Sequence, residues 1–301
     1  MTGVNQARDG DDRSGSVPDL VLGTAQWGQG YGITNRVGRP GDAEVSRIVA
    51  LALAGGIREV DTHRAQRAEQ GYGDAQARLA PWATRFQITT KVYAGSGEPI
   101  RDQLTRSLRE LTVDTVRACL IHDWTTVDDG RAREAARALA ALVDDGLCRY
   151  VGVSAYDAAD VLRAWDLFGP SVALQVPVSV LDQRLPRDGA AMEVLNRSPL
   201  VHVRSVFAQG LLLPHPVPTP WSDHPDVYRW RRAMARHRID AVEACLSFVR
   251  TLEWVDGVVV GVADAEQLEE ILQAWSRPPV TVDWTDFASD DPALVDPRRW
   301  R

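Results

Sequence analysis

Short apolar runs alternate with longer amphipathic stretches along the chain from residue 19 onward. The short runs are rich in β-branched residues, which is typical of buried strands, and they predict eight strands. These cover residues 20–23, 59–62, 86–91, 118–122, 150–154, 173–176, 201–205 and 258–261. The amphipathic stretches have apolar residues at helical spacing and predict helices at residues 43–54, 100–111, 132–143, 158–167, 241–252 and 265–275.

Eight units of strand followed by helix predict an α/β fold, a single-domain (β/α)8 TIM barrel, because right-handed crossovers leave few other arrangements. Asp42 and Asp264 stand directly before two of the predicted helices, so we predict that both are N-caps. We place the barrel at residues 18–290. A disordered N-terminal tail at 1–17, rich in Gly, Asp, Ser and Arg, precedes it, and a C-terminal tail at 291–301 follows.

Composition and charge narrow the classes of partner. The chain of 301 residues is 45% hydrophobic and has a net charge of −7. This acidic balance argues against nucleic acid or an anionic membrane as a partner, since both favour a basic face. No apolar run approaches the roughly 18 residues of a spanning helix. Cys119, Cys148 and Cys245 lack metal-ligand spacing, and we expect buried thiols in a reducing cytoplasm, no metal and a small-molecule substrate.

Lys91 is the only lysine among 34 basic residues, and it ends the third predicted strand. Arginine stays charged near neutral pH, whereas a lysine ammonium can lose its proton, retune a neighbouring group or attack a carbonyl. We therefore interpret Lys91 as a catalytic residue. The alternative is that one lysine survived a strong arginine bias by chance.

In a (β/α)8 barrel the catalytic groups lie at the carboxyl ends of the strands. The residues at these ends are Thr24, Gln26, Trp27, Asp61, Lys91, His122, Asp123, Trp124, Ser154, Gln175, Arg204 and Gly261. Asp61, Lys91 and His122 belong to three consecutive strands, and we predict that they converge at one barrel mouth. Taken singly, each has a structural alternative, such as a cap carboxylate for Asp61 and a hydrogen-bonded core histidine for His122.

Motifs occur along the chain in a fixed order and spacing. They are Leu22-Gly-Thr-Ala-Gln26 with Tyr31-Gly-Ile-Thr-Asn35, Val60-Asp-Thr62, Thr90-Lys-Val92, Leu120-Ile-His-Asp123, Val151-Gly-Val-Ser154, Leu174-Gln-Val-Pro177 with Leu181-Asp-Gln-Arg184, Arg204-Ser-Val-Phe-Ala-Gln-Gly-Leu-Leu212, and Val260-Gly261 with Glu266-Gln-Leu-Glu-Glu270. Over residues 19–275 the chain resembles the aldo-keto reductase superfamily, in particular an actinobacterial branch of it. The resemblance implies an NADP(H)-dependent carbonyl reductase without a metal.

The resemblance also implies a division of roles at the site. A tyrosine gives a proton to the carbonyl oxygen, Lys91 held by Asp61 lowers the pKa of that tyrosine, and His122 orients the carbonyl. A phenol with a pKa near 10 is a poor acid at neutral pH until a nearby cation stabilises its phenolate.

The tyrosine is missing from its expected place. The family pattern Asp-Thr-Ala-x-x-Tyr-Gly puts the phenol five residues after the aspartate, where this chain has Gln66, and His63 replaces the small residue of the pattern. Tyr72 follows six residues later. Because the spacing from Asp61 to Lys91 matches an uninterrupted family member, we interpret Tyr72 as part of the next helix. An insertion that makes Tyr72 the catalytic phenol is the alternative.

The cofactor positions implied by the resemblance are Ser154, Gln175, Arg204, Gly210, Leu212, Gly261, Gln267 and Glu270. Ser154 and Gln175 match residues that hold the nicotinamide amide. Residues 261–270 contain no Lys or Arg for a 2′-phosphate, and Asp264 would repel one. The candidate cofactors are therefore NADP, NAD or no nucleotide at all.

The leading hypothesis is a nicotinamide-dependent oxidoreductase of specialised metabolism, such as antibiotic biosynthesis, that acts on a small carbonyl or polyol compound. Trp27 and Trp124, with Trp221, are candidates for aromatic walls around a sugar-like or planar substrate, unless they only cap the barrel. A non-redox lyase, dehydratase or isomerase is one alternative, with Lys91 and His122 moving protons. A catalytically inactive binding or regulatory homologue is another, and the retained charged residues count against it.

Overall fold

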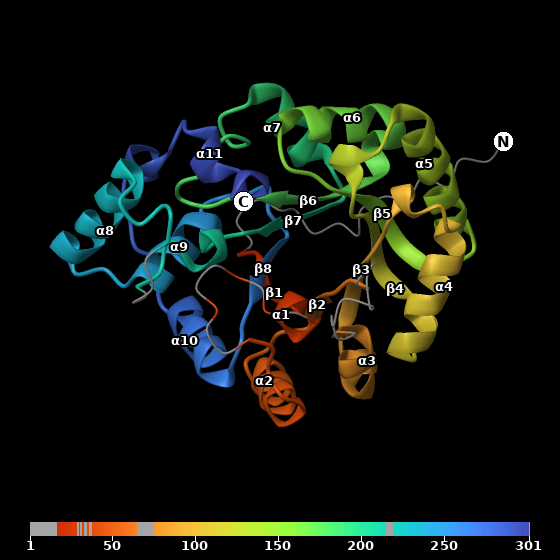
Figure 1. The fold of residues 1–301 in the computed structure, drawn as a ribbon, viewed down its shortest axis with the longest axis horizontal. Helices are drawn as coiled ribbons and strands as arrows, with labels where there is room; N and C mark the ends of the chain where they lie inside the picture. Colours follow the sequence, from red (N-terminus) through yellow and green to blue (C-terminus); the bar gives the residue numbers. More distant parts are fainter. Residues whose placement is uncertain are drawn as a thin grey trace.

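Eight parallel strands close into a barrel in the order of the sequence, as expected for a (β/α)8 fold (Figure 1). The computed structural model describes residues 17–28, 30, 32, 35, 38–64, 75–214 and 219–300. The strands are β1 Asp19–Gly23, β2 Glu59–Asp61, β3 Gln87–Val92, β4 Val116–Ile121, β5 Cys148–Ser154, β6 Val172–Pro177, β7 Leu200–Arg204 and β8 Gly257–Gly261. Each predicted strand ends within two residues of the observed one, so the predicted fold class is confirmed.

The helices lie around the strands in Figure 1. They are α1 Ala25–Gly28, α2 Asp42–Ala54, α3 Ala75–Leu79, α4 Ile100–Leu111, α5 Asp129–Asp144, α6 Ala158–Phe168, α7 Gly189–Arg197, α8 Pro225–His237, α9 Ala241–Arg250, α10 Ala265–Ser276 and α11 Pro292–Val295. Short 3₁₀ helices cover Ala80–Arg85, Ala94–Ser96, Trp124–Thr126, Gly169–Ser171, Ala208–Gly210, Trp284–Phe287 and Pro297–Arg299. All six predicted helices are present, whereas α1, α7, α8 and α11 were not predicted.

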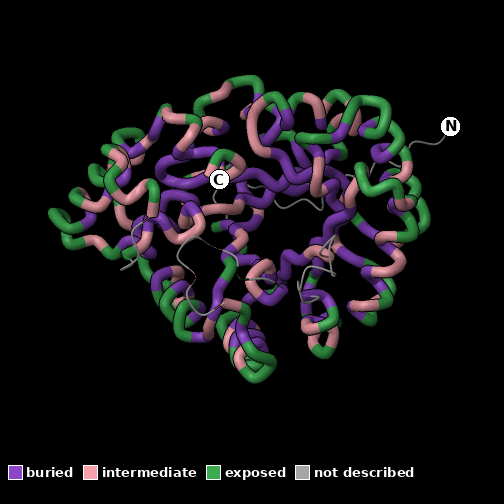
Figure 2. The backbone as a smooth tube through the Cα atoms, in the orientation of Figure 1, coloured by how far each residue is buried: buried purple, intermediate pink, exposed green. Residues whose placement is uncertain are grey.

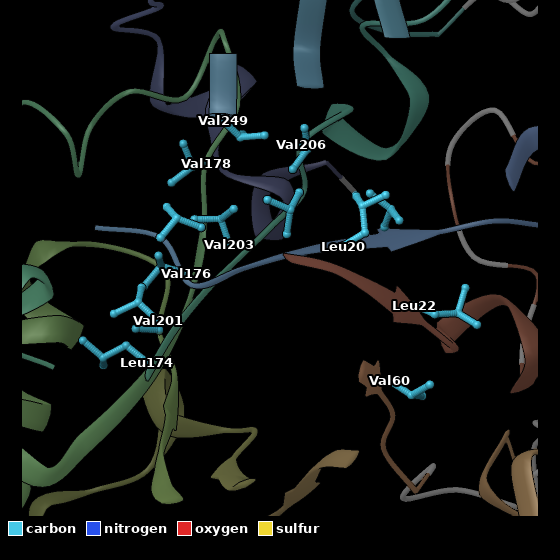
Figure 3. Packing of buried hydrophobic residues seen from close by; sticks show 14 of the residues in the cluster. Leu20, Leu22, Val60, Leu174, Val176, Val178, Val201, Val203, Val206 and Val249 are labelled. Atoms are coloured by element: carbon cyan, nitrogen blue, oxygen red, sulfur yellow. The ribbon is translucent and has the colours of Figure 1, made fainter. Parts of the chain in front are cut away.

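The outward faces of the strands form the main core under the helices. Leu174 and Val176 of β6 lie in register with Val201 and Val203 of β7, and all four are buried. Figure 3 shows these four side chains following one another along the two strands. Parallel strands covered on this face need continuous apolar runs, which explains why the strands were visible in the sequence. The tube in Figure 2 is accordingly buried along most of the barrel.

The strand register places a second set of side chains inside the barrel. Asp61 pairs with Thr89, and Lys91 pairs with Leu120 of the inner cluster formed by Ala118, Leu120, Ala173 and Leu200. Neighbouring residues in register point to the same face of a sheet. Asp61 and Lys91 therefore point into the barrel interior, at its carboxyl end.

The two predicted helix caps have different outcomes. Asp264 is the N-cap of α10, and its side chain accepts a hydrogen bond from the backbone of Gln267 at 2.8 Å, as predicted. The prediction for Asp42 is wrong, because Gly41 is the N-cap of α2 and Asp42 is its first helical residue. The carboxylate of Asp42 instead accepts hydrogen bonds from the Arg78 guanidinium at 2.7 and 2.9 Å.

The C-terminal residues pack on the barrel, which corrects the proposed boundary at residue 290. Leu294 and Val295 of α11 are buried, and they line a small cavity with residues of the segments that follow β6 and β7. Burying these apolar side chains favours attachment over a free tail. Residues 1–16 of the predicted N-terminal tail and Arg301 lie outside the described residues.

The three cysteines are buried and carry free thiols, as predicted. Burial raises the pKa of Cys148 to about 12, which makes this thiol unreactive. In the described part of the chain, no helix has the length and the apolar character that crossing a bilayer requires.

Candidate active site

A buried ion pair lies at the carboxyl end of the barrel interior. The ammonium of Lys91 donates to both carboxylate oxygens of Asp61, each at 2.6 Å. Lys91 is 5% exposed and Asp61 is 9% exposed. Burial lowers the pKa of Lys91 against the opposing pull of Asp61. The pKa of Asp61 is lowered as well, because Lys91 and hydrogen bonds outweigh its own burial. A charged pair this deep is costly to bury, which makes it the candidate for a functional site.

Gln175 connects this pair to the opposite wall of the barrel. Its amide Nε2 donates to Asp61 Oδ1 at 2.8 Å, although β6 and β2 are not neighbouring strands. At 1% exposed, Gln175 is buried among the inward-facing side chains. The carboxylate of Asp61 therefore has three hydrogen bonds from two side chains, which fix its orientation. The cofactor role implied for Gln175 remains a prediction.

Polar side chains between the first three strands hold the backbone beside Asp61. Thr24 donates from its hydroxyl to the hydroxyl of Thr62 at 2.9 Å, and its N–H donates to the carbonyl of Asp61 at 3.0 Å. The N–H of Thr62 donates to the carbonyl of Thr89 at 2.9 Å. Hydrogen bonds thus connect the ends of β1, β2 and β3. The backbone directly before His63 is therefore held in place.

Two histidines and a tyrosine lie next to the ion pair. The rings of His63 and His122 meet edge to face with centroids 5.2 Å apart. The ring of Tyr93 stacks on His122 at 5.0 Å with an interplanar angle of 15°. The charge of Lys91 acts on both imidazoles. The structure therefore brings Asp61, Lys91 and His122 together as the sequence predicts, and it adds His63 and Tyr93.

Burial and the nearby cation keep both imidazoles neutral. Burial lowers the pKa of His63 to about 4, with a further contribution from Lys91. Burial, His63 and Lys91 lower the pKa of His122 to about 3. The phenol of Tyr93 has a pKa raised to about 12 by burial and by the carboxylate of Asp123. With both imidazoles neutral, the ammonium of Lys91, whose pKa burial lowers, is the charged proton donor of this cluster.

Sequence reasoning noted His63 only as a departure from a pattern and missed Tyr93 altogether. A usable signal was present for Tyr93, because it follows Lys91 by two residues at the end of the same strand. Asp123, another strand-end candidate, instead accepts hydrogen bonds from the N–H groups of Ala94 and Gly95. It braces the loop after β3. Gln66 and Tyr72, the two candidates for the phenol position, lie outside the described residues.

The predicted aromatic wall is not formed by Trp27 and Trp124, which are both 0% exposed. The indole N–H of Trp124 donates to the carbonyl of Asp160 at 3.0 Å, and Phe168 contacts its ring. Trp124 is therefore a core residue between the barrel and α6. Trp221 is partly buried and packs near the ring of Trp300, at 6.2 Å. A position at the end of a strand does not reveal whether an aromatic ring points into the barrel mouth or packs under a helix. For this reason the sequence could not show that both rings are buried.

Trp124→Ala should lower the free energy of unfolding by about 3–5 kcal/mol, because it empties a core position and removes a buried hydrogen bond. Urea unfolding measures this loss. Tyr228→Ala is the control, since Tyr228 is 62% exposed and its removal should change stability little. Unchanged stability together with a raised substrate KM in Trp124→Ala would restore Trp124 as a substrate contact.

The residues implied for the nicotinamide half of a cofactor occupy the ends of β5 and β7. Ser154 is buried at the end of β5. Arg204 ends β7 and donates to the carbonyl of Ala155 at 3.2 Å. Its guanidinium lies 4.3 Å from the ring centroid of Tyr156, and that of Arg298 lies 4.4 Å from the same ring. The C-terminal segment is thereby attached to this rim of the barrel.

The remaining cofactor candidates lie after β7 and around the start of α10. Gly210 ends a 3₁₀ turn, and the carbonyl of Leu212 accepts from the indole of Trp230 at 2.9 Å. Gly261 ends β8, and a side chain there would require the amide of Gln26 to shift. Gln267 accepts from the N–H of Ala263 at 2.9 Å, and Glu270 lies exposed on α10.

Carboxylates occupy the first N–H groups of α10. The N–H of Ala265 donates to Glu44 at 2.7 Å, and that of Gln267 donates to Asp264. Arg47 is the cation beside them, and it pairs with both Glu44 and Glu266. These four side chains, Glu44, Asp264, Glu266 and Arg47, have a net charge of −2. This negative charge would repel a 2′-phosphate placed here, whereas ribose hydroxyls can donate hydrogen bonds to carboxylates.

The family model for the Aldo/keto reductase family matches residues 19–289, which is most of the chain. The chain belongs to this family. An aldo-keto reductase of Mycobacterium sp. (strain JLS) is 32% identical over 213 residues, covering 68% of this chain and 69% of its own length. The methylglyoxal reductase DkgA of Yersinia pestis is 31% identical over 126 residues, covering 42% of this chain and 45% of its own length. The chain spans about half the length of several curated relatives it matches.

Solved structures show the same fold in other members of the family. The holo form of an aldo-keto reductase from Bacillus halodurans has a TM-score of 0.74 and 20% identity over 95% of this chain and 96% of its own. A glycerol dehydrogenase from Gluconobacter oxydans has a TM-score of 0.68 and 18% identity over 93% of each chain. At such identities the likeness establishes the barrel alone.

Proposed function

We propose that this aldo-keto reductase family member is an oxidoreductase that interconverts a small carbonyl compound and its alcohol with a nicotinamide cofactor. The observation that carries the proposal is the buried Lys91–Asp61 pair beside His122, at the carboxyl end of the barrel. A relative named for methylglyoxal reduction supports a small aldehyde as the first substrate to try.

The chain's own residues supply the acid-base half of this chemistry. A bound nicotinamide supplies or accepts the hydride. Lys91 holds a proton at Nζ and stabilises negative charge on a nearby oxygen, and Asp61 with Gln175 fixes its position. Asp61 stays ionised because its pKa is lowered. Asp61 therefore keeps its charge and holds Lys91 in place while the Lys91 proton passes to the substrate oxygen.

NADH is the cofactor that we propose, in preference to NADPH. Ser154 and Arg204 would contact the nicotinamide half, and Glu44 and Asp264 would accept hydrogen bonds from ribose hydroxyls. The support is the net negative charge at the start of α10 and the occupied N–H groups of Ala265 and Gln267. Free buried thiols agree with a reducing cytoplasm. The departures at His63 and Gln66 favour a specialised pathway.

Titration with NADH and NADPH, followed by energy transfer from the chain's 10 tryptophans, tests this proposal. We expect NADH to bind at micromolar concentration and NADPH at least tenfold more weakly. NADH oxidation in the presence of methylglyoxal then tests the reaction. Tighter binding of NADPH would overturn the cofactor preference. If neither nucleotide gives energy transfer up to millimolar concentration, the redox function is overturned.

A lyase, dehydratase or isomerase is the second candidate function. The observation that favours it is the contact between His63 and His122 next to Lys91, because three nitrogen groups can move protons without a hydride. This reading predicts solvent deuterium incorporation into a carbonyl substrate without any nucleotide. The redox proposal predicts none.

A further inference from the structure

We propose that His63 acts with His122 as a second neutral imidazole that donates a hydrogen bond to the reacting oxygen of the substrate. The inference rests on the proposed carbonyl chemistry and deepens it. His63 would then contact the substrate oxygen together with His122, which orients the carbonyl, and Lys91, which supplies the proton. No proton leaves either ring in this role, so the proton that the oxygen gains comes from Lys91.

The first support is the geometry of the pair. The His63 ring meets the His122 ring edge to face at 5.2 Å and 79°, and Tyr93 stacks on His122 from its own side. Hydrogen bonds hold the backbone at or next to both histidines. His63 follows Thr62, which is bound to Thr24, and the N–H of His122 donates to the carbonyl of Val92 at 2.8 Å. The two imidazoles are therefore pre-positioned at the ends of β2 and β4.

The second support is the hydrogen bonding of the two rings within the described part of the chain. Neither His63 nor His122 forms a side-chain hydrogen bond with another described residue, although both are only partly exposed. A structural histidine at such a depth usually donates or accepts at a ring nitrogen. Tyr93, the neighbouring aromatic residue, contacts His122 through its ring face and fixes the imidazole plane.

The third support is the charge around the pair. Lys91 of β3, Asp61 of β2 and His122 after β4 face His63, while Lys91, His63 and Arg204 of β7 face His122. Two cations near a buried pair disfavour protonated imidazole, so each ring keeps one N–H donor and one acceptor nitrogen. A neutral imidazole can polarise a carbonyl oxygen through its N–H without carrying a charge of its own. Protonation would instead place a third charge beside Lys91.

Titration of the histidine ring signals by NMR tests the protonation states directly. The chain has 6 histidines, and His63→Gln and His122→Gln assign the two signals. We expect both rings to stay neutral down to about pH 5, since their pKa values are about 4 and about 3. In His63→Gln the pKa of His122 should rise, because His63 is one of the groups that lower it. This shift shows that the two rings lie in contact, and the kinetics decide whether His63 contacts the substrate.

Kinetics test the contact with substrate. His63→Ala should lower kcat about 100-fold, as for other lost donors to a reacting oxygen, and leave the NADH dissociation constant unchanged. His63→Gln keeps an N–H donor and should recover part of this loss. His237→Gln is the control, because His237 lies exposed on α8. Melting temperatures identify any variant that fails to fold.

Two results would overturn the inference. One is a kcat of His63→Ala within threefold of the wild type. The other is titration of His63 near pH 6.5 in the folded protein. A wild-type protein that binds neither nucleotide overturns the proposed redox function instead. In that case the ring titration decides the inference, and normal titration of both histidines ends it.

Discussion

Lys91→Arg should lower kcat by at least 100-fold while the melting temperature stays within a few degrees of the wild type. Arginine keeps the charge that Asp61 needs, so the buried carboxylate stays paired. It loses the compact ammonium that can approach a reacting oxygen and give up a proton near neutral pH. Steady-state kinetics and thermal unfolding of the same preparation measure the two effects.

Lys91→Met removes both the charge that pairs with Asp61 and the proton donor, whereas Lys91→Arg keeps the charge. Lys91→Met should also abolish turnover, but it leaves the Asp61 carboxylate buried and without its cation, which typically costs about 3–5 kcal/mol of stability. The contrast between a stable, inactive arginine variant and an unstable, inactive methionine variant identifies a catalytic lysine. If Lys91→Arg keeps activity within threefold at an unchanged melting temperature, Lys91 is a structural ion-pair partner and nothing more.

The barrel was predictable because its strands are buried on their outer faces. The strand β7, for example, has apolar residues on the face that the helices cover. A parallel strand buried on that face requires apolar side chains there. The contact between Lys91 and Asp61 was predictable as well. Both stand at the ends of neighbouring strands, and the carboxyl ends of parallel strands meet at one edge.

Contacts across the interior could not be predicted in the same way. Gln175 reaches Asp61 from the opposite wall, and that contact depends on the register of four intervening strand pairs. No local pattern encodes such a register. The orientation of Trp124 could not be predicted either. The sequence placed this residue correctly after β4, but its ring packs against α6. A strand end fixes where a residue lies, but neighbouring side chains decide which way it points.

The phenol position decides what the enzyme can do, and Gln66→Tyr should raise aldehyde reduction by about 10² to 10⁴. The expectation rests on the alignment in which Gln66 stands five residues after Asp61, where the family pattern has its tyrosine. An amide donates hydrogen bonds but does not transfer a proton at neutral pH, whereas a phenol beside the Lys91 ammonium does. Initial rates of NADH oxidation with methylglyoxal, for wild type and variant side by side, measure the gain.

Tyr72→Phe is the matched experiment on the competing alignment, because it removes one hydroxyl and little else. We expect it to keep native activity within threefold. Gln66→Tyr combined with Lys91→Met should lose the gain, since the new phenol depends on the lysine charge for its lowered pKa. Elimination of native activity by Tyr72→Phe at unchanged stability would reverse the assignment. The segment after β2 would then contain an insertion, and Tyr72 would be the proton donor that acts with Asp61, Lys91 and His122.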